Sequence, residues 1–304
     1  MKTNSVNFKQ YNACPACTSS RIELYRKSTF DFHSLRKDNL KITDKDYGKI
    51  WDLWRCCDCM HQFANPYPSS SFLFSLYEGI EDTLYDQEAS GRAHNFLPIL
   101  TYLEKMYPQK GSLFDIGAAT GILMKTAEER GWDPEGIEAS RWSVRIAEEK
   151  YGMKIISGDF LTADLKKDHY QAVTMVDFIE HVPHPMECIR KAHGILSPHG
   201  TLCLVTPDVK SLAAKAIGKK WWHFRPAHLG YFSFHSLATM LYKAEFRLTK
   251  VRRYSWTFSA HYLLSRLPVL NHFIKNPTLA SFWKKIQIKL PLQDSLEIYA
   301  KKSS

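Results

Sequence analysis

Short apolar runs alternate with longer stretches of helical spacing along the middle of the chain. The apolar runs predict strands over residues 113–116, 135–138, 154–156, 172–176 and 201–205, and the longer stretches predict helices over 122–130, 141–150, 186–196 and 236–244. Strands that alternate with helices are typical of a mostly parallel sheet with helices on both faces. Ligands of such sheets bind at the carboxyl ends of the strands, so we expect the functional site there.

The pattern changes on both sides of this region. Apolar residues at helical spacing predict helices between residues 71 and 107, and "FRLTKVRRYSW" and "LEIYAKK" predict two late strands. Between these strands, residues from about 257 to 287 are expected to form a helical, aromatic and basic insertion, and long insertions are more often functional than connective. The insertion could cover a substrate pocket, pack as an ordinary helix, or contact a membrane surface through Trp283, Lys284, Lys285 and Lys289.

The N-terminal region contains two CxxC pairs, "CPAC" and "CCDC". Their outer cysteines are Cys14, Cys17, Cys56 and Cys59. Two such pairs can place four thiolates around one tetrahedral zinc ion, and a segment this short needs a metal to supply much of its folding energy. Redox-active or disulfide-forming pairs are the alternative. Cys57 or His61 could also replace one ligand, whereas Cys188 and Cys203 lie in apolar surroundings and are expected in the core.

Composition and charge limit the classes of protein that this chain can be. With 304 residues, 44% of them hydrophobic, it can bury a large core. Residues 209–304 contain 17 Lys and Arg against 3 Asp and Glu, which indicates an anionic partner or a solvated basic face. No apolar stretch reaches the roughly 18 residues of a membrane span, and the first residues do not resemble a signal peptide, so a cytoplasmic protein is expected.

The glycine turn after the first predicted strand departs from the dinucleotide-binding fingerprint. In "LFDIGAATGI" the positions of the second and third glycines of GxGxxG are Ala119 and Ile122. Without these two glycines the backbone cannot approach a pyrophosphate closely, which argues against a dehydrogenase. Asp115, directly before the turn, would repel a pyrophosphate but would suit a cationic ligand or an amino group.

Several motifs in order resemble those of a known enzyme family. "DIGAATG", "GIEAS", "SGDF", "VDFIEHVPHP", "HGTLCLVTPD" and "HLGYFSFHSLATMLYKAEF" are similar to class I S-adenosylmethionine-dependent methyltransferases, from about residue 111 to the C-terminus. The double CxxC with "NPYP" is similar to a bacterial subgroup that has an N-terminal zinc-binding segment. The resemblance implies an α/β fold, namely a Rossmann-like, doubly wound seven-stranded sheet with a small N-terminal zinc-ribbon-like unit. The expected organisation is a zinc-binding unit (1–70), a helical linker (71–110) and a methyltransferase domain (111–304).

The resemblance also implies a site for S-adenosylmethionine. Its residues would be Asp115, Gly117, Ala118, Gly121, Glu138, Asp159, Phe160, Asp177 and Phe178. Glu138 is apt for the two ribose hydroxyls, because a carboxylate accepts charge-assisted hydrogen bonds from both. Asp159 matches the acid near the adenine amino group, and Phe160 could pack on the ring. Asp177 and Phe178 match the position that faces both cofactor and acceptor.

Methyl transfer to a hydroxyl needs a base, and histidine suits this role. His181 follows the fourth predicted strand and is the first candidate, and His228 is the second. "DFIEHV" also resembles the E-x-x-E-H sequence of ubiquinone-pathway O-methyltransferases, which implies that Asp177, Glu180 and His181 could instead hold a divalent ion.

The leading hypothesis is methyl transfer to oxygen, or carbon, of a small polar and anionic acceptor such as a nucleotide sugar or polysaccharide precursor. One alternative is an RNA methyltransferase, although Lys and Arg in the zinc-binding segment are nearly matched by Asp and Glu. The other alternative is a non-catalytic scaffold that binds S-adenosylmethionine.

Overall fold

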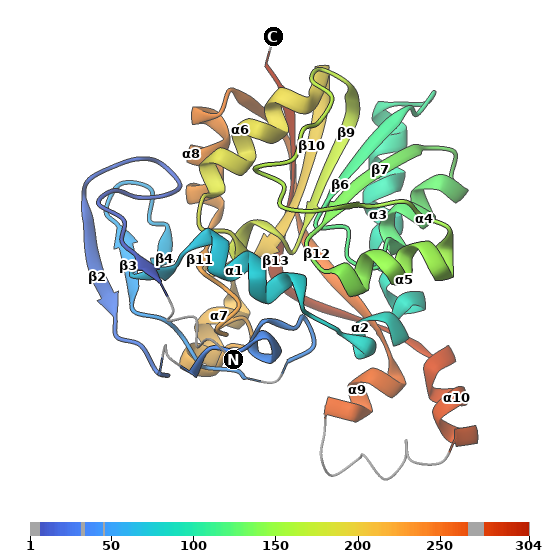
Figure 1. Cartoon of the computed structure of the whole chain (residues 1–304), viewed down its shortest axis with the longest axis horizontal. Coiled ribbons are helices and arrows are strands. Elements are labelled where there is room, and N and C mark those ends of the chain that lie inside the picture. Colours follow the sequence, from blue (N-terminus) through green and yellow to red (C-terminus); the bar gives the residue numbers. More distant parts are fainter. Residues whose placement is uncertain (1–6, 32–33, 45, 267–276, 304) are drawn as a thin grey trace.

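A mixed seven-stranded sheet forms the centre of the protein (Figure 1). The computed structural model describes residues 7–31, 34–44, 46–266 and 277–303. The strand order is β12-β13-β10-β9-β6-β7-β8. The strands are β6 (Ser112–Ile116), β7 (Asp133–Glu138), β8 (Ile156–Ser157), β9 (Tyr170–Val176), β10 (Leu196–Pro207), β12 (Phe246–Ser259) and β13 (Gln287–Lys302). β6, β7, β8, β9 and β10 are parallel to one another, and β13 runs antiparallel to both β10 and β12. The expected α/β fold is therefore confirmed.

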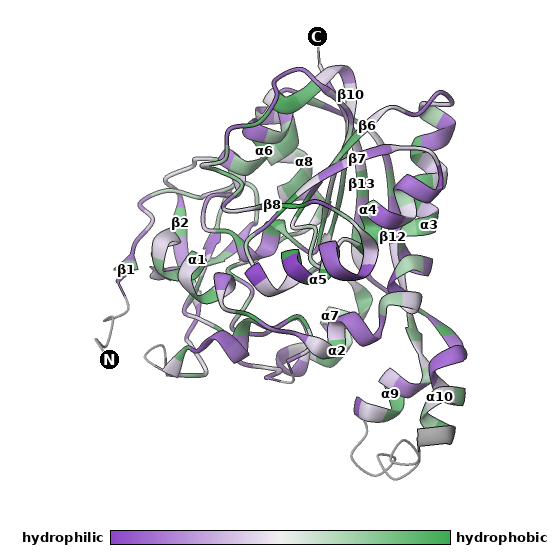
Figure 2. Ribbon diagram, turned by 45° about the vertical axis from the view of Figure 1, so that its right-hand side comes forward, coloured by the Kyte–Doolittle hydropathy of each residue, from purple (hydrophilic) through white to green (hydrophobic). Residues whose placement is uncertain are grey.

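Helices cover both faces of this sheet. On one face, α6 (Pro185–Ile195) and α8 (Phe234–Lys243) pack against residues of β6, β9 and β10. On the other face, α3 (Ala89–Met106) and α4 (Ile122–Glu129) pack against the same three strands. α5 (Arg141–Tyr151) follows β7. The strands in the middle are largely apolar because both of their faces are buried, as for all of β6 and for β10 from Gly200 to Pro207; Figure 2 colours the apolar residues of the sheet green. The predicted helices in this region lie within two residues of the observed ones.

The N-terminal region is built on a second, four-stranded sheet of order β11-β4-β3-β2. Its strands β2 (Ile22–Arg26), β3 (Leu53–Cys56) and β4 (Gln62–Ala64) come from the cysteine-rich unit, whereas β11 (Gly230–Tyr231) comes from the chain after β10. A short pair, β1 (Phe8–Lys9) and β5 (Tyr67–Pro68), lies beside it. The cysteine-rich unit therefore shares a sheet with the rest of the protein.

Further contacts fasten this unit to the segment between β10 and α8. The indole Nε1 of Trp51 donates to the carbonyl oxygen of Pro226 at 2.9 Å, and Nη1 of Arg225 donates to the carbonyl oxygen of Ile42 at 2.9 Å. Arg225 also pairs with the carboxylate of Asp44. The remaining helices of the first half, α1 (Ser70–Glu78) and α2 (Thr83–Gln87), connect the unit to α3. Short 3-10 helices span Lys37–Leu40, Ile179–His181 and Gly218–Lys220, the last following α7 (Leu212–Ile217).

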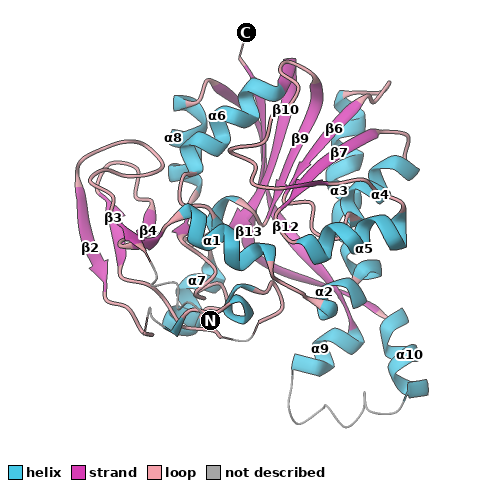
Figure 3. Ribbon diagram, viewed as in Figure 1, coloured by secondary structure: helices cyan, strands magenta, loops and turns pink. Residues whose placement is uncertain are grey.

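The late insertion differs from expectation at its two ends. α9 (Ala260–Arg266) and α10 (Pro277–Lys285) are helical, but residues 257–259 and 287–289 continue β12 and β13 as a two-stranded ribbon (Figure 3). The final strand begins at Gln287, well before the predicted "LEIYAKK", because its first half pairs only with β12 and lacks a continuous apolar pattern. Residues 267–276 of the predicted insertion lie outside the described residues. Within the described part of the chain, no helix has the length and apolar character that crossing a bilayer requires.

Candidate active site

A cavity of about 210 Å³ lies at the carboxyl ends of the central strands. The sheet side of its lining includes Asp115, Gly117, Ala118, Ala119, Glu138, Asp159, Phe160, Asp177, Phe178 and His181. The opposite side comes from the N-terminal half and includes Leu40, Ile42, Leu73, Phe74 and Tyr77. The expected cofactor residues thus converge on one cavity, with the exception of Gly121.

The glycine turn between β6 and α4 forms one wall. Gly117 has a φ of +77°, and a Cβ added to it would meet Cδ2 of Phe178 at 2.9 Å, so glycine is required there. The amides of Gly117 and Ala118 both donate to the carbonyl oxygen of Ile137, at 3.0 Å, which ties the turn to β7. Gly121, with a φ of +75°, caps the start of α4 instead of lining the cavity.

Two carboxylates flank this turn. Asp115 is 4% exposed and accepts a hydrogen bond from Oγ1 of Thr174 at 2.6 Å, and burial raises its pKa to about 7. Glu138 accepts from the amide of Ala119 at 2.9 Å through Oε2 and from that of Ser140 at 2.8 Å through Oε1. Burial raises the pKa of Glu138 as well. Each oxygen of Glu138 has a lone pair left for a hydroxyl group.

Asp177 and Phe178, an acid and an aromatic residue, directly follow β9. Asp177 has a φ of +50°, its Oδ1 is buried with no hydrogen-bond partner among the described residues, and burial raises its pKa to about 6. The ring of Phe178 meets the ring of Phe160 edge to face, with centroids 6.3 Å apart. Asp159 accepts from the amide of Leu161 at 2.9 Å. The cavity lining thus combines the carboxylate oxygen Oδ1 of Asp177 with two aromatic rings.

His181 is held by contacts at one ring nitrogen. Its Nδ1 lies 2.9 Å from the carbonyl oxygen of Ala227 and 3.0 Å from the hydroxyl oxygen of Tyr77. Because a carbonyl oxygen can only accept, Nδ1 carries the proton and Nε2 keeps its lone pair. Burial lowers the pKa of His181 to about 3, so the ring is neutral. His228 lies behind it, 4% exposed and outside the described lining of the cavity, with the two ring centroids 4.8 Å apart.

A second group of potential ligands lies at the same place. Ligand atoms of Glu180, His181 and His228 all lie within 4.8 Å of one another. Oε1 of Glu180 and Nδ1 of His228 are buried without hydrogen-bond partners in the described part of the chain, while Oε2 of Glu180 accepts from Thr206. The resemblance to E-x-x-E-H predicted that Asp177 would join Glu180 and His181 as a metal ligand. In the structure the third potential ligand beside these two is His228.

Sequence reasoning missed Arg92, which lines the cavity from α3. It is 8% exposed, and its guanidinium carbon lies 3.5 Å from the ring centroid of Tyr85. Its Nε is buried and has no hydrogen-bond partner among the residues that the structure describes. No carboxylate among the described residues forms an ion pair with it. One signal was available, because Arg92 lies one helical turn before the buried Phe96 on the apolar side of a predicted helix.

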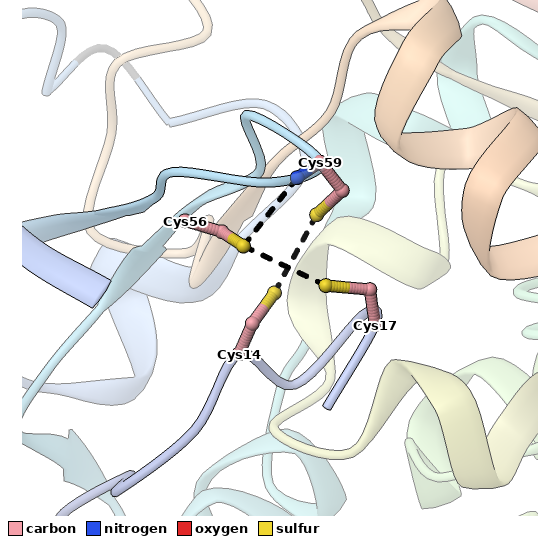
Figure 4. Close-up of side chains that lie close together, drawn as sticks. All are labelled: Cys14, Cys17, Cys56 and Cys59. Atoms are coloured by element: carbon pink, nitrogen blue, oxygen red, sulfur yellow. Dashed lines mark hydrogen bonds between the residues drawn. The ribbon is translucent and has the colours of Figure 1, made fainter. Parts of the chain in front are cut away.

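The four cysteines of the CxxC pairs meet at one buried point (Figure 4). Sγ of Cys14 lies 3.6 Å from Sγ of Cys59, and Sγ of Cys17 lies 3.5 Å from Sγ of Cys56. A disulfide would bring two sulfurs to about 2.05 Å, whereas tetrahedral thiolates on a zinc ion at about 2.3 Å stand about 3.8 Å apart. The donor set and its spacing fit one metal ion, and Cys57 is exposed and outside the group.

Comparisons with known proteins agree with this geometry. A family model described as "Methyltransferase domain" matches residues 89–251. The ubiquinone biosynthesis O-methyltransferase of Pseudomonas aeruginosa is 24% identical over 139 residues, which cover 43% of this chain and 60% of that enzyme. The enzyme of the same name from Haemophilus ducreyi is 28% identical over 104 residues, covering 31% and 44%. The chain thus spans about half the length of these two curated relatives.

A solved structure shows the same fold. The YcgJ protein from Bacillus subtilis aligns with a TM-score of 0.51 at 13% identity, covering 69% of this chain and 99% of that chain.

Proposed function

Because this chain belongs to the class I S-adenosylmethionine-dependent methyltransferases, we propose that it transfers a methyl group to a hydroxyl oxygen of a small acceptor, with His181 as the base. The observation that carries this proposal is the position of His181. The residue lines the cavity, and the contact of its Nδ1 with Ala227 leaves Nε2 free to take a proton.

The residues of the cavity fit S-adenosylmethionine. Two buried atoms of oppositely charged residues that line it, Oδ1 of Asp177 and Nε of Arg92, have no hydrogen-bond partner in the part of the chain that the structure describes. The amino and carboxylate groups of the methionine part would satisfy both, since buried charges need partners. Glu138 would accept the ribose hydroxyls, and Phe160 with Asp159 would hold the adenine. When bound, the cofactor supplies a methyl group that its sulfonium has already activated.

The residues of the chain orient the bound groups and remove the proton of the acceptor hydroxyl. The Phe178 side chain packs close to Gly117 and fixes the turn, which orients the bound groups. The neutral His181 accepts the hydroxyl proton at Nε2, and the resulting cation would lie beside Glu180, whose carboxyl group can stabilise it.

The acceptor half of the cavity is mainly apolar. Leu40, Ile42, Leu73 and Phe74 line it, and Arg92 is the only Lys or Arg in the described lining. An acceptor with an apolar body and one hydroxyl near His181 fits this half best. The anionic acceptor expected from the sequence, such as a nucleotide sugar, would have to keep its phosphates outside the cavity.

A metal-assisted form of the reaction is the second candidate. It is favoured by the convergence of Glu180, His181 and His228, since Oε1 of Glu180 and Nδ1 of His228 have no hydrogen-bond partner within the described residues. Two imidazoles and one carboxylate suit a divalent ion, which would lower the pKa of an acceptor hydroxyl. At the N-terminal cysteines, the fitting ion is zinc in a structural role.

The test is transfer of radiolabelled methyl groups to a panel of hydroxyaromatic compounds, nucleotide sugars and RNA. We expect labelled product from a hydroxyl compound, and at least a hundredfold loss of turnover in His181→Gln. Chelator treatment followed by metal analysis separates the two candidates, because only the metal-assisted reaction stops when a second ion is removed and the cysteine-bound ion is kept. Label on RNA alone would contradict the proposal.

A further inference from the structure

The β12–β13 ribbon extends beyond the sheet and ends in two short helices. Register pairs continue from Trp256↔Leu290 to Ser259↔Gln287, after which α9 and α10 follow. β12 is antiparallel to β13, and β13 to β10, so β12 runs parallel to β10. Its last residue therefore leaves the sheet at the edge where the cavity lies, and Figures 1 and 3 show α9 and α10 standing away from the rest of the protein there.

The end of this ribbon exposes large apolar and basic side chains together. We define the insertion face by Leu279, Phe282, Lys284, Lys285, Ile288 and Lys289. Phe282 is 55% exposed, Leu279 43% and Ile288 37%. Residues 279–293 contain no Asp or Glu, and none of the three lysines pairs with a carboxylate among the described residues. Exposed apolar side chains beside unneutralised positive charge are typical of a surface that binds another molecule.

A second element at the same edge has the same character. α7 follows β10 and exposes Leu212, at 80%, and Ile217, with Lys215 on the same short helix and Lys219 and Lys220 directly after it. Two separate segments thus present apolar side chains with lysines at the carboxyl edge of the sheet.

We propose that the insertion face docks on the surface of an anionic lipid bilayer, with α7 as a secondary contact. Aromatic and aliphatic side chains beside lysines are the composition of interfacial helices, in which the apolar groups enter the headgroup region and the lysines contact anionic headgroups. Nucleic acid would use the charges but would leave Phe282 and Leu279 in water. This proposal does not depend on the methyl-transfer reaction.

The docking would place the mouth of the cavity at the bilayer. Nη1 of Arg266, at the end of α9, donates to the carbonyl oxygen of Asp44 at 3.3 Å. Ile42, two residues before Asp44, lines the cavity and is 38% exposed. The insertion therefore contacts the chain two residues after Ile42, one of the residues that line the cavity.

The experiment is sedimentation of the full chain with vesicles of phosphatidylcholine, with and without phosphatidylglycerol. We expect partitioning onto the anionic vesicles to exceed that onto neutral ones by about tenfold or more and to fall as salt is raised. The triple variant Phe282→Ser, Lys284→Glu, Lys285→Glu should lose at least about tenfold of this binding. Its matched control is Tyr242→Ser, Lys105→Glu, Lys154→Glu, whose exposed side chains lie near the other edge of the sheet and which should bind as the wild type does.

Circular dichroism and S-adenosylmethionine affinity of both triple variants show whether either variant is misfolded. If the insertion-face variant fails to fold, the single variant Phe282→Ser takes its place in the experiment. The proposal is overturned if the wild type does not bind anionic vesicles, or if it binds neutral vesicles as strongly as anionic ones. It is overturned as well if the control variant loses as much binding as the insertion-face variant. It is also overturned if light scattering shows a dimer that only the insertion-face variant dissociates, because a second copy of the chain would then cover this face.

Discussion

The hydroxyl oxygen of Tyr77 lies 3.0 Å from Nδ1 of His181, although 104 residues separate the two in the chain. Tyr77 belongs to α1, directly after the cysteine-rich unit, and His181 follows β9 of the central sheet. The candidate base is thus held between the two parts of the protein. A metal ion bound by the four cysteines would therefore influence the geometry of the proposed reaction, because it would stabilise the unit that precedes α1.

Removal of the Tyr77 hydroxyl should slow turnover without weakening cofactor binding. In Tyr77→Phe, His181 keeps its contact with Ala227 and so its tautomer, but loses one polar neighbour. One hydrogen bond of this kind is worth about 1 kcal/mol, so we expect kcat to fall about fivefold. Steady-state kinetics measure this, with Tyr242→Phe, exposed on α8, as the control. Unchanged kcat, or an equal loss in cofactor affinity, would refute the assignment.

Cofactor affinity should rise with pH between about 6 and 8. Burial raises the pKa of Asp115 to about 7 and that of Asp177 to about 6, so both carboxyl groups are partly protonated and neutral below these values. A cationic ligand favours their ionised forms, and its affinity therefore increases as pH rises through the two pKa values and then levels off. Titration calorimetry at several pH values gives the profile. Asp115→Asn should shift the rise toward lower pH, and an identical profile in that variant would exclude Asp115 as its cause.

Arg92 should contribute to cofactor affinity through its charge. Arg92→Met removes a cation that forms no ion pair with a carboxylate of the described residues, and we expect a loss of about tenfold to a hundredfold in affinity for S-adenosylmethionine. Arg92→Lys should recover part of it. The control is Arg145→Met, an exposed arginine on α5. Full affinity in Arg92→Met would show that another group binds the methionine carboxylate.

The cysteine group should bind one metal ion per chain and stabilise the fold. Cys56→Ser removes one of four thiolates, so metal analysis should show loss of the ion and thermal unfolding should move down by about 10 °C or more. Cys57→Ser, one residue away but exposed, should keep both the ion and the melting temperature. Equal behaviour of the two variants would argue against the four-cysteine site.

Local patterns in the sequence explain most of the central sheet and part of the site. The strand ends that carry Asp115, Glu138 and Asp177 follow from apolar runs of strand length, and parallel strands bring their carboxyl ends to one edge. The cysteine site follows from spacing alone because each CxxC pair is a local unit.

The remaining features depend on contacts between distant segments. β11 has only two residues, too few to give a periodic signal, yet it joins the cysteine-rich unit to the rest of the protein. The meeting of Tyr77 with His181, and of His228 with Glu180, is set by how loops fold over the sheet edge. No hydrophobic period encodes such pairings, because tertiary packing decides them.

Titration calorimetry with S-adenosylmethionine tests the central claim most directly. We predict binding of one cofactor per wild-type chain, and affinity at least about tenfold weaker in Glu138→Ala, which removes the acceptor for the ribose hydroxyls. Glu149→Ala, an exposed acid on α5, should bind as the wild type does. Absence of binding by the wild type, or full affinity in Glu138→Ala, would contradict the assignment of this cavity as the cofactor site.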